Sequence, residues 1–174
     1  MTREKRNLTG VERHLPPETI IVSKTDVKGR ITYANQPFLD IAGYAEDEVL
    51  GKPHNLVRHP EMPRCVFHLL WNAISSGREI FAYVVNLAKN GDHYWVFAHV
   101  TPTFDAAGQV KGYHSSRRAP RPEAVAAVRA LYADLCAEEA RHANPKDAIA
   151  AATELLSKKY IGPGGTYEDL VFSL

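Results

Sequence analysis

An Asn-Gly dipeptide between two long apolar segments constrains the fold of this chain more than any other feature. Asn90-Gly91 stands in "KNGD", and this pair is the strongest short signal for a tight hairpin turn. It joins two predicted strands at about residues 79–88 and 93–104, and a further strand is predicted at about 110–118. Both alternating faces of the two long strands are largely apolar. The sheet therefore needs a covering layer on each side.

The segment before these strands predicts a second hairpin and then helices. Two runs rich in β-branched residues, about 19–25 and 30–34, flank a turn at Lys28-Gly29. Two short helical segments end at Gly43 and Gly51, and apolar residues at helical spacing predict a longer helix from Pro63 to Gly77. The sequence thus predicts an α+β domain over residues 19–118, with a five-stranded antiparallel sheet and helices on one face. Residues 1–18 form an N-terminal extension whose basic start, "MTREKR", is predicted to be a frayed terminus.

Residues 119–174 predict two amphipathic helices. One begins near Pro122, and the other begins at Asn144-Pro145 and ends before Gly162. Two alternatives are open for this helical hairpin. It packs on the sheet face that carries Trp95 and Phe97, or it forms a dimer or partner interface.

Charge and cysteine content exclude several classes of function. Twenty-one basic and 20 acidic residues among 174 give a net charge of +1, so nucleic acid is not expected as a partner. No apolar run approaches the roughly 18 residues of a membrane span, so we expect a cytoplasmic protein without direct membrane insertion. Cys65 and Cys136 lie far apart without a CxxC motif, which favours two structural thiols over a disulfide or a zinc site.

One face of the first long strand has unusually little side-chain volume. It carries Ala82, Val84 and Ala88 around a single amide, Asn86. Protein interiors do not tolerate so much missing volume, so either large helix residues such as Trp71 fill the space or a ligand does. A buried amide also needs a partner, because leaving it without one costs about 1 to 3 kcal/mol.

The loop "HNLVRHPEMPRCVFHLLW", residues 54–71, offers the polar groups that such a ligand would need. Arg58 has a planar charged fork suited to a phosphate or a carbonyl edge. His59 can donate to a second oxygen, Asn55 can donate and accept, and Trp71 offers an aromatic surface. The alternative is an ordinary turn with a surface pair between Arg58 and Glu61.

The order of elements, together with "GYAEDEVLGKPHNLVRHPEMPRCVFHLLW" and "VVNLAKNGDHYWV", resembles the flavin-binding PAS domains of bacterial aerotaxis receptors. The resemblance spans about residues 19–118 and implies a noncovalently bound FAD between the helices and the sheet, whose redox state is the signal. Two positions depart from the family: Glu61 replaces an aspartate and Phe81 replaces a second tryptophan. The family's cofactor residues correspond to Arg58, His59, Trp71 and Asn86.

Light-sensing relatives of this family add two expectations. Their final strand faces the reactive edge of the flavin, so His114 or Ser116 is expected to contact it here, with a surface position as the alternative. Their adduct-forming cysteine corresponds to a position near His54, which we add to the candidate cofactor residues. Cys65 lies elsewhere, so no photochemical adduct is expected.

Reduction turns the flavin N5 from a hydrogen-bond acceptor into a donor. An amide or imidazole that donated a hydrogen bond to the oxidised ring must therefore rotate. A mismatch of about 1.5 to 3 kcal/mol shifts a two-state balance roughly tenfold to a hundredfold. The predicted function is therefore redox or oxygen sensing, as in aerotaxis or energy taxis. The signal is expected to leave through contact with a chemoreceptor or kinase-type partner, from a homodimer.

Two other functions stay open at this point. Eight histidines permit a haem-binding PAS gas sensor, with His68 as the candidate ligand. A cofactor-free interaction or dimerisation module is the structural alternative. An enzyme is not expected, because no nucleophile–base motif, spaced carboxylate pair or glycine-rich phosphate loop is present.

Overall fold

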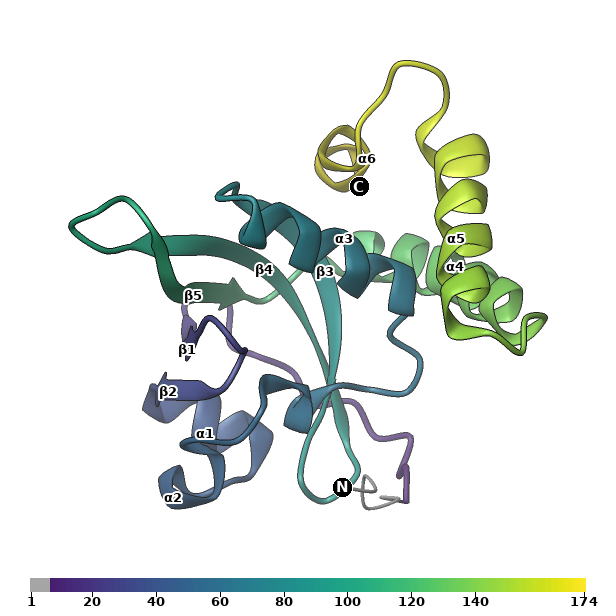
Figure 1. Cartoon of the computed structure of the whole chain (residues 1–174). Coiled ribbons are helices and arrows are strands. Elements are labelled where there is room, and N and C mark those ends of the chain that lie inside the picture. Colours follow the sequence, from purple (N-terminus) through teal and green to yellow (C-terminus); the bar gives the residue numbers. More distant parts are fainter. Residues whose placement is uncertain (1–6) are drawn as a thin grey trace.

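The computed structural model describes residues 7–174; the basic run "MTREKR" lies outside the described residues. Its centre is a five-stranded antiparallel sheet in the order β2-β1-β5-β4-β3 (Figure 1). This confirms the predicted fold class. The strands are β1 (Ile21–Asp26), β2 (Ile31–Ala34), β3 (Ile80–Leu87), β4 (His93–Phe104) and β5 (Val110–Arg118).

Four helical elements between β2 and β3 form one side of the domain. The helices are α1 (Gln36–Ala42), α2 (Glu46–Val49), the short 3-10 helix η1 (His54–Val57) and α3 (Arg64–Ser75). Asn35 caps α1 by accepting a hydrogen bond from the Phe38 N–H, and Gly43 ends the helix with φ of +71°, a conformation that glycine adopts without steric cost. Helix α3 buries Val66, Leu70 and Ile74 along one side, as its apolar spacing predicts.

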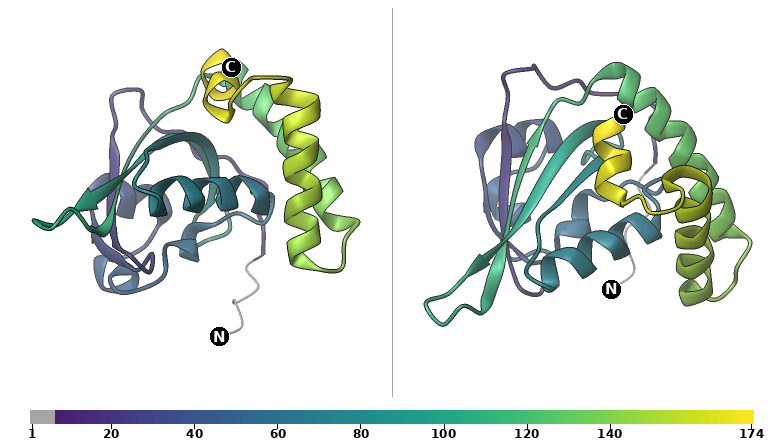
Figure 2. Two further views of the ribbon diagram at one scale, coloured as in Figure 1. Left: turned by 45° about the horizontal axis from the view of Figure 1, so that its top comes forward. Right: turned by 90° about the horizontal axis from the view of Figure 1, so that it is seen from above.

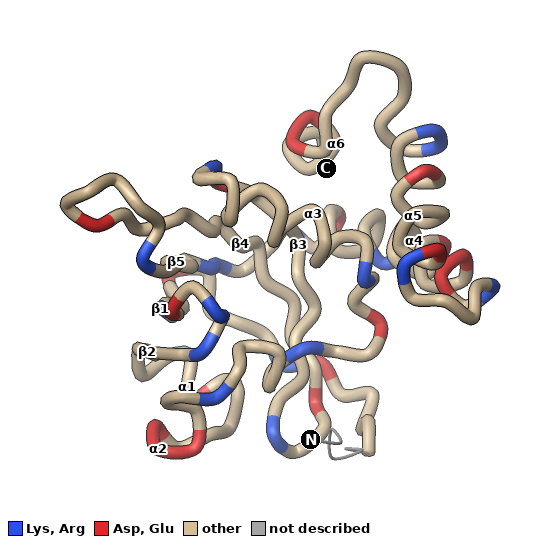
Figure 3. The backbone as a smooth tube through the Cα atoms, viewed as in Figure 1, with Lys and Arg blue, Asp and Glu red and all other residues tan. Residues whose placement is uncertain are grey.

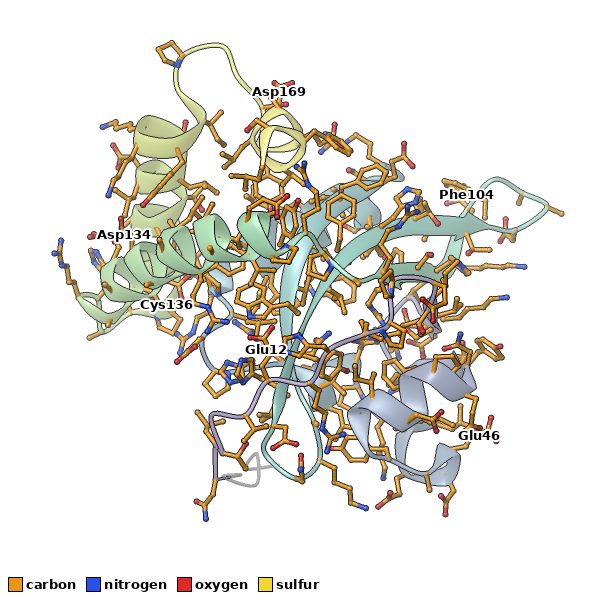
Figure 4. The ribbon with its side chains drawn as sticks, turned by 180° about the vertical axis from the view of Figure 1, so that it is seen from behind. Glu12, Glu46, Phe104, Asp134, Cys136 and Asp169 are labelled. Atoms are coloured by element: carbon orange, nitrogen blue, oxygen red, sulfur yellow. The ribbon has the colours of Figure 1, made fainter. Side chains whose placement is uncertain are left out.

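The C-terminal segment adds further helices, of which the first and the last cover the opposite face of the sheet. They are α4 (Pro122–Ala140), α5 (Pro145–Leu155) with its π-helical continuation η2 (Leu156–Ile161), and α6 (Tyr167–Ser173), which the sequence analysis did not predict. Seen from behind, α4 crosses in front of the strands (Figure 4). The Tyr132 hydroxyl of α4 donates to the Tyr83 carbonyl at 2.6 Å, and Phe172 of α6 lies against Phe81 and Phe97. Packing on the sheet face is therefore the alternative that the structure supports.

Helices α4 and α5 lie side by side at one end of the sheet, next to the start of α3 (Figure 2). Asn144 caps α5 by accepting a hydrogen bond from the Lys146 N–H, and Pro145 follows it in the first turn. The predicted hairpin of two helices is thus confirmed. Its position brings α5 into contact with α3 as well as with α4.

The N-terminal segment pairs with the β3–β4 hairpin. The Thr9 N–H donates to the Gly91 carbonyl at 3.0 Å, and the Arg13 guanidinium contacts the Asp92 carboxylate at 2.9 Å. Gly91 has φ of +97°, and a Cβ atom there would lie 2.0 Å from the Asn7 carbonyl oxygen. Only glycine fits this turn, which explains the Asn-Gly pair in the sequence.

Charged residues of both signs are interspersed along the chain (Figure 3). Within residues 7–174 no helix is both long and apolar enough to cross a bilayer.

Candidate functional site

A cavity of about 430 Å³ lies between the sheet on one side and η1 and α3 on the other. This volume falls within the usual range of small-molecule sites. Its polar and charged lining residues come from every layer of the domain: Ser23, Thr25, Lys28, His54, Asn55, Arg58, Arg64, His68, Asn86, Tyr113, Ser115 and Arg117.

The floor of the cavity is made of small side chains on the central strands. Val84 of β3 and Ala98 and Val100 of β4 line it. Val84 belongs to the predicted low-volume face of β3, whose Ala82 and Ala88 do not line the cavity. Two polar atoms on the same surface are buried without a hydrogen-bond partner, the amide nitrogen Nδ2 of Asn86 and the hydroxyl oxygen of Ser115. Stranding such groups costs about 1 to 3 kcal/mol each. The cavity therefore presents unsatisfied polar atoms that a bound ligand would satisfy.

Arg117 lies in the cavity wall with only 5% of its surface exposed. Its Nη2 atom donates to the Ser23 hydroxyl at 2.7 Å and to Nε2 of His54 at 2.8 Å. Burial lowers the pKa of the guanidinium to about 10, so it stays charged at neutral pH. No salt bridge within the described residues involves Arg117. The sequence analysis missed this residue, because an arginine late in a strand ordinarily points to solvent.

His54 begins η1 and lies beside the buried arginine. Since the arginine only donates, Nε2 of His54 accepts, and the neutral ring carries its proton on Nδ1. Burial and the neighbouring Arg117 charge lower the pKa of His54 to about 3. The predicted residue thus lines the cavity as a neutral imidazole, next to a permanent cation.

Arg58 and Asn86 are brought together by an antiparallel backbone bridge. The Arg58 guanidinium lies over the Phe67 ring, 4.4 Å from its centroid, and its Nη2 atom donates to the Met62 carbonyl at 3.0 Å. These contacts orient the guanidinium at the cavity wall, which Asn55 also lines. These contacts of Arg58 are thus with Phe67 and Met62, and they do not include the alternative surface pair with Glu61.

Trp71 lines the cavity at its rim, with 38% of its surface exposed. Its indole meets Tyr113 edge to face, with ring centroids 5.6 Å apart. It also covers Gly29 in the β1–β2 turn, where a Cβ atom would lie 2.8 Å from Cη2. The side chain therefore closes one end of the cavity without filling its floor.

Three of the eight predicted cofactor residues do not line the cavity. His59 is buried elsewhere, with its ring 5.6 Å from that of His93 and its Nδ1 accepting from the Glu61 N–H. On β5, Ser115 pairs with Ser23, while Ser116 pairs with Val22. Since neighbouring residues of a strand point to opposite faces, Ser115 lines the cavity and Ser116 and His114 face away from it. The expected placement of these three residues is corrected accordingly.

The two positions that depart from the aerotaxis family also lie outside the cavity. Phe81 stacks on His99 on the outer face of the sheet, with centroids 4.1 Å apart. The Glu61 side chain is 73% exposed. Neither departure alters the cavity lining.

The thiols and the candidate haem ligand take no central position in the cavity. Burial raises the pKa of Cys65 to about 12 and that of Cys136 to about 11, and neither lines the cavity. His68 lies at the rim and is exposed. In the part of the chain that the structure describes, no three His, Cys, Asp or Glu side chains gather as metal ligands.

The cavity lining is positively charged, although the chain as a whole has a net charge of only +1. Within the described residues, the cavity is lined by Lys28, Arg58, Arg64 and Arg117 and by no aspartate or glutamate. A deep floor of small apolar residues with unsatisfied polar atoms, bounded by four cations, suits a flat polar ring that carries anionic groups.

Residues 31–117 match the family model described as "PAS fold". The chain belongs to the PAS family, which confirms the resemblance found in the sequence. Over 118 residues it is 42% identical to the aerotaxis receptor of Escherichia coli (strain K12), a match that covers 68% of this chain and 23% of the receptor. It is 26% identical over 100 residues to the nitrogen fixation regulatory protein of Klebsiella pneumoniae, covering 58% of this chain and 20% of that protein.

Solved structures of light-oxygen-voltage domains share the fold. The light state of the blue-light photoreceptor Aureochrome1 LOV gives a TM-score of 0.57 at 22% identity, covering 66% of this chain and 88% of that one. A light-oxygen-voltage domain described with a flavin analogue gives 0.56 at 24% identity, covering 63% and 82%. At these identities the likeness establishes the fold alone. The chain is thus a PAS-family protein that is related in sequence to the aerotaxis receptor.

Proposed function

We propose that this PAS domain, over residues 19–118, binds FAD noncovalently and acts as a redox sensor that signals through protein contacts, without catalysing a reaction. The observation that carries the proposal is the composition of the cavity wall. Asn86 and Ser115 offer polar atoms without partners, and every charged residue among the described lining is a cation. A flavin ring with hydrogen-bonding edges and an anionic tail matches both features.

The residues of the cavity divide into two sets by depth. Asn86, Ser115 and His54 lie where they can bond the polar edge of a flat ring over the small-residue floor. Arg117 places its charge beside this set and favours any negative charge that the ring acquires. Trp71 closes the end of the cavity over Gly29 and excludes water from the ring.

The remaining cations suit the phosphates of the dinucleotide. Arg58 is held by Phe67 and the Met62 carbonyl, and Arg64 and Lys28 line the same cavity and are exposed to solvent. Arginine forks are the usual protein partners of phosphate oxygens. When bound, FAD would supply reversible electron uptake with a change in the hydrogen bonding of its ring.

Relatives support the sensory role in general terms. The aerotaxis receptor shares 42% identity with this chain, and one structural relative is described with a flavin analogue. This chain spans only 23% of the receptor, so its output is part of the proposal. We propose a chemoreceptor or kinase-type signalling protein as the partner, contacted by a homodimer.

The haem and cofactor-free alternatives have less support. His68 lines the cavity but is exposed, and iron ligation by an imidazole would not account for the buried polar atoms of Asn86 and Ser115. A permanently empty cavity would leave them in the same state.

The absorption spectrum of freshly purified protein tests the proposal, followed by mass identification of the released chromophore. If the protein is isolated without chromophore, it is mixed with FAD, FMN or riboflavin and passed through a desalting column. We expect flavin absorption that is retained with FAD and is weaker with riboflavin, which lacks the phosphates. A sharp haem band, or a protein that retains no flavin, would contradict the proposal.

A further inference from the structure

The helical hairpin formed by α4 and α5, which follows the predicted sensory domain, supplies part of the cavity wall. Ile149 of α5 lines the cavity together with Arg64 and Phe67 of α3. Helix α5 contacts α3 directly, and the two lie next to each other at the start of α3 (Figures 1 and 2). The cavity is therefore complete only while the hairpin is docked.

The hairpin also caps α3. Pro63 at the N-cap has no side chain that can accept a hydrogen bond, and the Cys65 N–H in the first turn donates instead to the Glu139 carboxylate of α4 at 2.9 Å. A carboxylate at this end of a helix satisfies a backbone donor and complements the helix dipole. Helix α3 thus depends on α4 for an interaction that most helices obtain from their own N-cap residue.

A second contact lies one turn away on α4. The thiol of Cys136, labelled on α4 in Figure 4, donates to the Glu61 carbonyl at 3.3 Å. The two contacts hold residues 61–65, the segment between Arg58 and the body of α3. The same segment is tied to the cavity, because the Arg58 guanidinium donates to the Met62 carbonyl. Residues 61–65 therefore lie between the cavity wall and the hairpin, with hydrogen bonds to both.

We infer that ligand binding in the cavity and docking of the α4–α5 hairpin stabilise each other. Undocking removes the Ile149 wall, uncaps α3 and releases the segment that positions Arg58, so each change weakens ligand binding. Linkage is reciprocal, and a bound ligand must therefore stabilise the docked hairpin by the same factor. This inference rests on the proposed function, which supplies the ligand.

Glu139→Ala and Cys136→Ala test the coupling, because neither side chain lines the cavity. Glu138→Ala is the matched control, since Glu138 bonds Arg141 and His142 at the end of its own helix. The measurements are the equilibrium affinity for FAD and the hydrogen exchange of α4 and α5 amides with and without FAD. We expect Glu139→Ala to lower the FAD affinity at least fivefold, the low end of typical coupling, with Cys136→Ala lowering it less and Glu138→Ala leaving it unchanged. FAD should slow exchange in α4 and α5 of the wild-type protein.

Wild-type affinity in both test variants, with exchange in the hairpin unaffected by FAD, would overturn the inference and leave flavin binding intact. A wild-type protein that binds no flavin would instead overturn the proposed function together with this inference.

Discussion

The Nη2 atom of Arg117 lies 2.8 Å from Nε2 of His54, a contact that joins β5 to η1 across the wall of the cavity. The pair consists of a buried cation and a neutral imidazole, without a carboxylate to balance the charge within the described residues. An unbalanced buried charge destabilises a fold. A role in binding a ligand would explain why the Arg117 charge is buried at the cavity wall.

Replacing Arg117 with methionine should affect the folding stability of the protein and its affinity for FAD in different ways. The substitution removes a buried charge but keeps a long apolar stem, so we expect the flavin-free protein to unfold with the same free energy or with about 1 kcal/mol more. The FAD affinity should fall about tenfold to a hundredfold, the value of one or two charged hydrogen bonds. Urea denaturation and flavin titration measure the two effects. Arg118→Met, on the exposed neighbour, is the control, and wild-type FAD affinity in Arg117→Met would contradict the assignment.

Adjacent serines on β5 test which face of the strand meets the ligand. The Ser115 hydroxyl has no hydrogen-bond partner among the described residues, so Ser115→Ala should raise the free energy of unfolding of the flavin-free protein by about 1 kcal/mol. It should lower the FAD affinity several-fold, because one hydrogen bond contributes about 0.5 to 1.5 kcal/mol. Ser116→Ala removes the same group from the opposite face and should leave the affinity unchanged. A larger effect at Ser116 than at Ser115 would show that the strand register described above is wrong.

His54 gives the stability of the protein a defined pH dependence. Its pKa is about 3 in the folded protein, below the ordinary value of 6.5, so the unfolded chain takes up the proton first as the pH falls. The stabilisation is complete above pH 6.5 and is lost progressively toward pH 3, by at most about 1.4 kcal/mol per pH unit. Urea denaturation between pH 7.5 and 4.5 should show this slope in the wild-type protein and a smaller one in His54→Gln.

The pH range of the effect distinguishes the contribution of His54 from that of the carboxylates whose pKa values are lowered. Hydrogen bonds from Thr9, Asn90 and Arg13 lower the pKa of Asp92 to about 2, so its contribution is lost only below its ordinary value of 3.8. Burial and the nearby Lys24 charge also lower the pKa of His114, so part of the wild-type slope should persist in His54→Gln. An identical slope in His54→Gln would mean that His54 is not buried as a neutral imidazole.

Two glycines with nearly equal φ allow the cost of backbone strain to be distinguished from the cost of a clash with Trp71. Gly29 and Gly108 have φ of +74° and +75°, so alanine at either position costs about 1 kcal/mol in backbone conformation. At Gly108 the space around the new methyl group is open, whereas at Gly29 it would lie 2.8 Å from the Trp71 ring. We expect Gly29→Ala to lose about 1 kcal/mol more than Gly108→Ala and to shift the tryptophan emission. Equal losses with unchanged emission would place the indole away from the turn.

Much of the fold and part of the site follow from local sequence signals. The hairpins at Gly29 and Gly91, the helix that begins after Pro63 and the small-residue floor around Asn86 all depend on turn chemistry or strand alternation. These signals act over a few residues, so a single sequence is enough to read them.

The register of β5 could not be predicted in the same way. Both alternating sets of "YHSSR" contain polar residues, so alternation alone does not tell which set is buried. Pairing of Ser115 with Ser23 and of Arg117 with Ile21 decides it, and this information lies in β1, about ninety residues away. Helix α5 was likewise predicted as a helix, but its contribution of Ile149 to the cavity depends on tertiary packing.

A crystal structure of the protein with FAD tests the central claim most directly. We predict the flavin ring over Val84, Ala98 and Val100, with its polar atoms within hydrogen-bond distance of Asn86 Nδ2 and the Ser115 hydroxyl, and with the Arg117 guanidinium beside the ring. FAD bound elsewhere on the chain, with those two polar atoms still lacking partners, would contradict the account.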